Sequence, residues 1–169
     1  GLTDHLVARS HECDFPGKVQ TLPTATFANI DSNATSQVID TEVQSRLAKG
    51  LSLYGIQQEL LRDLQPDFIV TQTQCDVCAV SLADVKSFLK DEVGVRAELI
   101  VLAPNTLEDV WQDIRNVSQT IGVPQRGIEL VSRLEKRLQS IQSKSQSLTR
   151  PRVAMIEWTE PLMAAGNWV

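Results

Sequence analysis

Three cysteines and one histidine have side chains that could bind a metal ion or perform redox chemistry. Cys75 and Cys78 are separated by two residues, and at this spacing two thiolates can bind one tetrahedral ion. Cys13 and His11 could supply the other two ligands. The same CxxC could instead form a redox disulfide or consist of ordinary core or cleft thiols. We expect no stoichiometric metal, because structural zinc sites usually contain two such pairs; a metal- or thiol-dependent enzyme remains the alternative function.

Polar residues gather in three segments that helix or strand periodicity does not explain. Each segment directly follows an apolar run that predicts a β-strand. In open α/β sheets, ligands bind outside the carboxyl ends of the strands, so we expect all three segments to face one crevice. The candidate ligand-binding residues in these segments are His11, Glu12, Cys13, Asp14, Gln74, Cys75, Cys78, Trp158, Asn167 and Trp168.

Two kinds of side chain in this set suit a flat, metal-containing ligand. The imidazole of His11 could coordinate the metal centre of a corrinoid or haem-like molecule, or it could simply bond to backbone in a loop. Trp158 and Trp168 could stack on a macrocycle, or they could be buried against a second lobe. Trp111 lies on an apolar helical stripe, and we assign it to the core.

The elements that must position these side chains alternate between short apolar runs and helical periods. This pattern predicts a layered α/β fold with a Rossmann-like, mainly parallel sheet. The predicted strands are residues 6–9, 68–70, 99–102 and 153–156. The predicted helices are residues 39–47, 56–64, 106–121 and 124–148, and a further helix begins at Ser81.

Local signals mark where several of these helices begin and end. Ser81 and Thr106 are hydroxyl residues with an acid three positions later, which is typical of a helix start. Pro124 suits a first helical position, and the helix that follows it is long, with one apolar stripe. Arg150-Pro151 is expected to end it.

Composition excludes several classes of function. The chain has 169 residues, 42% hydrophobic content and a net charge of -5, and its 16 basic residues are scattered, which disfavours nucleic acid as a partner. No apolar run approaches the roughly 20 residues that cross a bilayer, so we expect no membrane insertion. The sequence also contains no glycine-rich phosphate loop, no HExxH and no GxSxG motif.

The order of the motifs RSHECDFP, LQPDFIVTQ, TLEDVWQDIRNVSQTIG and RPRVAMIEW resembles a known family across nearly the whole chain. It is similar to the cobalamin- and iron-siderophore-binding type of periplasmic solute-binding protein, a component of ABC importers. The resemblance implies two α/β lobes joined by one long helix, with the ligand held between them. It divides this chain into an N-terminal lobe (1–122), a connecting helix (123–149) and the start of a second lobe (150–169).

The resemblance also implies partners and a location. Each lobe of such proteins offers an acidic residue to a membrane permease, and Asp84 is the candidate here, although its place in the capping pattern explains it equally well. The implied ligand is a corrinoid or a siderophore-like iron chelate, bound as cargo by a protein with no catalytic activity and no cofactor of its own. The implied location is periplasmic or otherwise extracytoplasmic; a cytoplasmic corrinoid sensor or chaperone is the third alternative.

The chain departs from the family pattern at both ends. The family's first strand and helix would precede Gly1, and most of its second lobe would follow Val169. With one lobe incomplete, we expect the 169-residue chain to bind its ligand poorly. We also expect self-association through residues 153–156, because an unpaired apolar strand exposes backbone groups that another chain can cover.

Overall fold

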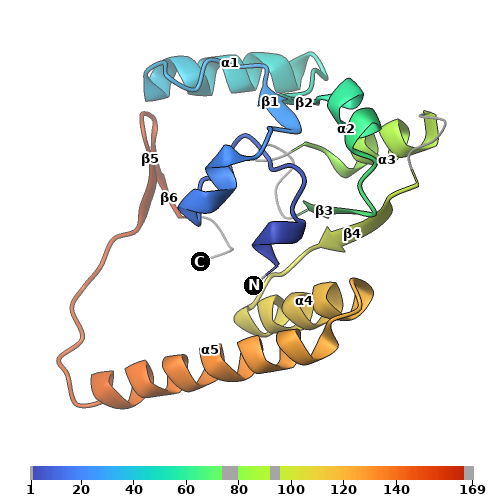
Figure 1. Ribbon diagram of the computed structural model, residues 1–169. Helices are drawn as coiled ribbons and strands as arrows, with labels where there is room; N and C mark the ends of the chain where they lie inside the picture. The colour runs from blue at the N-terminus through green and yellow to red at the C-terminus, as the bar shows by residue number, and fades with distance from the viewer. Residues whose placement is uncertain (1, 74–79, 92–95, 166–169) are drawn as a thin grey trace. The chain divides into compact units, whose positions relative to one another are not determined.

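The computed structural model describes residues 2–73, 80–91 and 96–165. They belong to two compact units, Gly1–Val101 and Leu102–Val169, and each is described by itself. Helices and short strands alternate along the chain (Figure 1), so the expected α/β class is confirmed. No helix in the described residues is long and apolar enough to cross a membrane.

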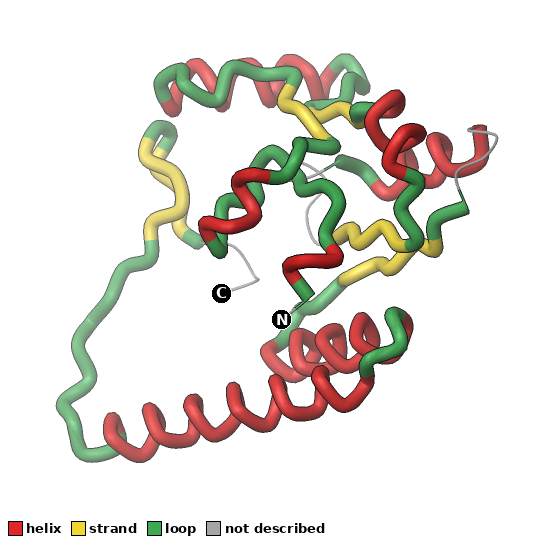
Figure 2. Tube along the Cα trace, viewed as in Figure 1, coloured by secondary structure: helices red, strands yellow, loops and turns green. Residues whose placement is uncertain are grey.

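The first unit contains two pairs of strands, with helices between them. Strands β1 and β2 pair antiparallel, and β3 pairs with β4, which reaches the boundary between the units. The N–H of Glu98 donates to the carbonyl of Asp67 (2.8 Å), so β3 and β4 begin side by side, as in a parallel pair with α3 as the crossover (Figure 2). The elements are 3-10 helices at Thr3–His5 and Gly17–Thr21, β1 (Thr26–Ala28), α1 (Ser36–Ala48), β2 (Tyr54–Ile56), α2 (Gln58–Leu64), β3 (Phe68–Gln72), α3 (Leu82–Asp91) and β4 (Glu98–Leu102).

The core of this unit forms where α2 and α3 pack on the strands. Leu61 of α2 and Phe88 of α3 are buried together, because the apolar residues of each helix recur on one side. Five partly buried apolar residues pack against this pair: Ala25, Ile56, Ile69, Leu89 and Ala97. They lie in β2, β3 and α3 and just before the first residues of β1 and β4. This packing fixes the strand ends from which the loops of the unit start.

The second unit consists of two packed helices, α4 (Leu107–Thr120) and α5 (Pro124–Ser145), and a hairpin, β5 (Ile156–Thr159) with β6 (Leu162–Ala164). The two helices lie side by side, with Trp111 and Val131 buried (Figure 1). Arg115 of α4 pairs with Glu135 of α5 at 3.6 Å across this contact. Trp111 is therefore a core residue, as expected.

Two of the predicted helix starts, at Ser81 and Thr106, are correct in detail. Thr106 accepts a hydrogen bond from the N–H of Asp109, and the Asp109 carboxylate accepts one back from the N–H of Thr106. Ser81 Oγ accepts from the N–H of Asp84 at 3.1 Å. These bonds satisfy helix N–H groups that have no partner within the helix.

Several predicted strands were wrong. Among residues 6–9 only Arg9 makes a strand contact, an isolated parallel bridge to Thr24, and Leu6 and Val7 are exposed. The strand expected at 153–156 lies further along, at Ile156–Thr159, and it pairs in an antiparallel hairpin. Strand β2 occupies the expected start of the second helix. The expected parallel sheet is present but short, as the β3–β4 pair, and the other two strand pairs in the described residues are antiparallel. A short apolar run does not reveal which distant segment it pairs with.

The expected division into residues 1–122, 123–149 and 150–169 stays a prediction. The long helix itself is present as α5 and ends at Ser145, a little before Leu148.

Candidate functional site

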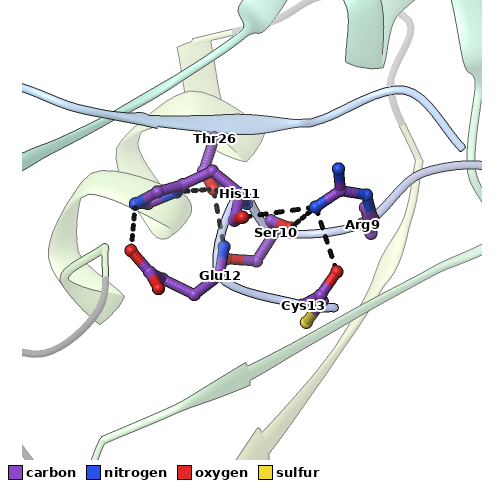
Figure 3. Close-up of polar contacts among 6 residues, drawn as sticks. All are labelled: Arg9, Ser10, His11, Glu12, Cys13 and Thr26. Atoms are coloured by element: carbon purple, nitrogen blue, oxygen red, sulfur yellow. Dashed lines mark hydrogen bonds and ion pairs between the residues drawn. The ribbon is translucent and has the colours of Figure 1, made fainter. Parts of the chain in front are cut away.

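The segment from Ser10 to Asp14 forms a loop, and the side chain of Arg9 donates hydrogen bonds to its backbone. Nη1 of Arg9 donates to the carbonyl oxygens of Ser10 (3.1 Å), His11 (3.2 Å) and Cys13 (3.0 Å), as Figure 3 shows. Arg9 is fixed in turn, because its backbone N–H donates to Pro23 O at 3.0 Å. The arginine that holds the loop is therefore itself held by a backbone hydrogen bond.

The imidazole of His11 is tethered to the neighbouring strand β1. Its Nδ1 lies 2.7 Å from the hydroxyl of Thr26, and the same hydroxyl accepts the backbone N–H of His11 at 3.0 Å (Figure 3). When the Thr26 hydroxyl directs its own proton at Ser10 Oγ (3.3 Å), Nδ1 carries the imidazole proton and Nε2 carries the lone pair. Nε2 makes no hydrogen bond within the described residues.

Glu12 covers the second ring nitrogen of His11. Its Oε1 lies 3.4 Å from Nε2, which makes an ion pair when the imidazole is protonated. The Glu12 side chain is 68% exposed and that of His11 is 20% exposed. An exposed glutamate can rotate away at little cost, whereas the Nε2 atom is itself buried and makes no hydrogen bond within the described residues.

Tyr54 of β2 completes the cluster from the other strand of the pair. Its ring lies 5.3 Å from the His11 ring, measured between centroids, at an interplanar angle of 40°. Burial raises the pKa of the Tyr54 phenol above 10.0, and the negative charge of Glu12 raises it further. The phenol therefore stays protonated at neutral pH.

The Tyr54 pKa can be tested directly, because Tyr54 is the only tyrosine in the chain. We expect tyrosinate absorption to appear with a midpoint above 10.0, and the Glu12→Gln variant to titrate at lower pH than the wild type yet still above 10.0, since burial remains. Exposed Glu59 on α2 offers the matched control, Glu59→Gln. Equal midpoints for the wild type and Glu12→Gln would contradict the proximity of Glu12 to Tyr54.

The other candidates in this loop are exposed. The thiol of Cys13 is free and exposed, and the carbonyl of Asp14 accepts a hydrogen bond from Nε2 of Gln20 at 2.9 Å. No group of three His, Cys, Asp or Glu residues that could hold a metal ion occurs in the part of the chain that the structure describes.

The structure brings together only part of the expected site. Five of the expected residues lie outside the described residues: Gln74, Cys75, Cys78, Asn167 and Trp168. The expected approach of Cys75 and Cys78 to the Ser10–Asp14 loop therefore stays a prediction. Trp158 lies in β5, half-buried, and its Nε1 donates to the carbonyl of Glu160 at 2.9 Å.

Asp84 lies exposed in the first turn of α3. Besides the cap to Ser81, its Oδ2 accepts a hydrogen bond from the hydroxyl of Ser52 at 3.3 Å. The carboxylate thus has a local structural role, and its predicted contact with a permease stays a prediction.

One solved structure resembles this chain, whereas no protein-family model and no curated protein matches its sequence. The structure is the "Periplasmic heme-binding protein BhuT in complex with two hemes (holo-2 form)", with a TM-score of 0.60 and 16% sequence identity over 89% of this chain. The fold is that of a periplasmic binding protein. The match covers 46% of the other chain, so this chain spans about half the length of its structural neighbour. The expected periplasmic-binding-protein fold is confirmed, while its cobalamin or siderophore type is not.

Three residues of the His11 cluster were not predicted from the sequence. Thr26 and Tyr54 belong to β1 and β2, two strands that the sequence analysis did not predict. Arg9 was assigned to a strand, and nothing in a single arginine indicates that its side chain turns back into the next loop. The β-branched and aromatic residues in Thr26-Phe27 and Tyr54 were a weak signal for strands.

Proposed function

We propose that this chain is part of the solute-binding component of an ABC importer and that it binds a metal chelate whose metal ion meets His11. The ligand classes that fit are haem-like macrocycles, corrinoids and iron-siderophore complexes. The observation that carries the proposal is the His11 imidazole, which is tethered through Nδ1 at 2.7 Å and makes no hydrogen bond through Nε2 in the part of the chain that the structure describes.

Metal-binding histidines typically show this arrangement. One ring nitrogen bonds to the protein, which fixes the tautomer and the ring orientation, and the other nitrogen is left for the metal. Thr26 supplies the first bond here, and rotation of the exposed Glu12 would uncover Nε2. One imidazole from the protein leaves the rest of the metal's coordination to the chelate itself, which suits a ligand that arrives with its metal already bound.

The structural neighbour supports the same class of function. That protein is described as binding two hemes in the periplasm, and this chain shares its fold over 89% of its own length. On this proposal the chain acts outside the cytoplasmic membrane, binds without chemical conversion and delivers its ligand to a permease, with Asp84 as a docking residue. Stacking of Trp158 and Trp168 on a flat ligand stays a prediction.

An absorption titration tests the proposal. The 169-residue chain is titrated separately with ferric haem, aquocobalamin and a ferric hydroxamate siderophore, and the spectrum of each is followed. We expect at least one of the three to bind with a shifted band that indicates coordination by a nitrogen ligand. Unchanged spectra for all three, up to ligand concentrations of about 1 mM, at which binding contributes only roughly 4 kcal/mol, would reject the proposal.

A further inference from the structure

We infer that Arg9 is a positioning residue that presets the direction of the His11 imidazole before any ligand arrives. The inference concerns the same site as the proposed function and rests on that function for its meaning in binding. Its structural part, the control of His11 by Arg9, can be tested without a ligand.

Arg9 and Thr26 together hold both backbone polar groups of His11. The N–H of His11 donates to Thr26 Oγ1 (3.0 Å), and the carbonyl of His11 accepts from Nη1 of Arg9 (3.2 Å). With both groups held, the backbone dihedral angles at this residue have little freedom. The ring, tethered at Nδ1, then points in one direction (Figure 3).

Nη1 of Arg9 also bonds the carbonyls of Ser10 and Cys13, which lie on either side of His11. One charged donor thus binds three backbone carbonyl groups of the same loop. Hydrogen bonds from a charged donor are stronger than neutral ones, and they act here on a segment with little apolar packing of its own. Without the guanidinium, these carbonyls would turn to water and the loop would sample several conformations.

Preorganisation of this kind raises affinity, because ordering the loop no longer costs free energy when the ligand binds. Groups that orient a metal-binding histidine typically change metal affinity by about 10- to 100-fold when they are removed. We expect an effect near the lower end of this range for Arg9, since the Thr26 tether remains.

The ligand-free test uses the small number of histidines. The chain has two, and His5 is exposed at the end of a short helix, so it serves as an internal reference. With 15N-labelled histidine, we expect the imidazole nitrogens of His11 in Arg9→Met to move towards the tautomer-averaged values of His5, while His5 itself does not change. Thr26→Val, which removes the ring tether, gives the size of the shift for a released imidazole, and Arg9→Lys should lie between the wild type and Arg9→Met.

The binding test uses ferric haem. We expect Arg9→Met to bind it about tenfold more weakly than the wild type and Arg9→Lys to recover part of the loss. Arg133→Met, the same change at an exposed position on α5, should match the wild type in both tests. If Arg9→Met does not fold, Arg9→Gln replaces it.

Unshifted His11 signals in a folded Arg9 variant would overturn the inference. If the wild type binds haem, an Arg9 variant with the same haem affinity would overturn it as well. If the wild type binds no haem, the imidazole signals still decide the role of Arg9. The proposed function is then decided by the titrations with aquocobalamin and the siderophore.

Discussion

Replacing His11 with alanine should weaken the binding of ferric haem by on the order of 100-fold, which corresponds to roughly 2.7 kcal/mol. The reason is that Nε2 of the His11 imidazole makes no hydrogen bond within the described residues, whereas Nδ1 is already bonded to Thr26. The variant loses the metal–nitrogen bond and retains the apolar contacts of the ligand. An absorption titration measures both the affinity and the loss of the nitrogen-ligated band.

Two controls separate coordination from a change in the fold. His5→Ala removes the other histidine, which lies exposed outside the cluster, and should leave affinity unchanged. Free imidazole added to His11→Ala should restore part of the nitrogen-ligated spectrum, because the space left by the ring can admit it. Wild-type affinity in His11→Ala, or equal losses in the two histidine variants, would show that His11 does not bind the metal.

Gly127→Ala is expected to destabilise the packing of α4 and α5 by about 2 kcal/mol. A Cβ atom at Gly127 would lie 1.9 Å from Oγ and 2.6 Å from Cβ of Ser118, and 3.2 Å from the carbonyl of Ile114. Ser118 is buried on the facing helix and bonded to Arg115 O, so it cannot rotate away freely. Overpacking of this severity costs about 3 kcal/mol, and the better helix propensity of alanine returns roughly 1 kcal/mol of it.

Chemical unfolding of three further variants tests this explanation. Ser118→Gly removes the side chain that the new Cβ would meet, so the double variant should be more stable than the sum of the two single changes predicts. Gly17→Ala is the matched control, since nothing lies within 4 Å of a Cβ built there. The helix contact would be looser than described if Gly127→Ala unfolded at the same denaturant concentration as the wild type.

Residue patterns over a few positions were enough to predict much of this fold. Three helix starts were marked by short-range patterns, namely Thr106 with Asp109, Ser81 with Asp84, and Pro124. Each of these signals acts through hydrogen bonds or backbone limits within one helical turn. Gly122, with a φ of 77°, ends α4 for an equally local reason, because residues other than glycine are strained there. The strands β3 and β4 were predicted from short apolar runs rich in β-branched residues, which are too short for a typical helix.

Strand pairing and the His11 cluster were decided by tertiary structure. Thr26 lies opposite Ile56 in the β1–β2 pair and also bonds to His11, 15 residues earlier in the chain. The strand pairing leaves no periodic trace, because cross-strand bonds join backbone groups that every residue has. The bond from the Thr26 hydroxyl to His11 leaves none either, because a single side-chain contact between distant residues has no period. The sequence alone determined that His11 was a candidate metal-binding residue in a loop of an α/β protein. Only the folded chain, by bringing Thr26 and Arg9 to the two sides of the His11 backbone, determined that Nδ1 is held and that Nε2 makes no hydrogen bond within the described residues.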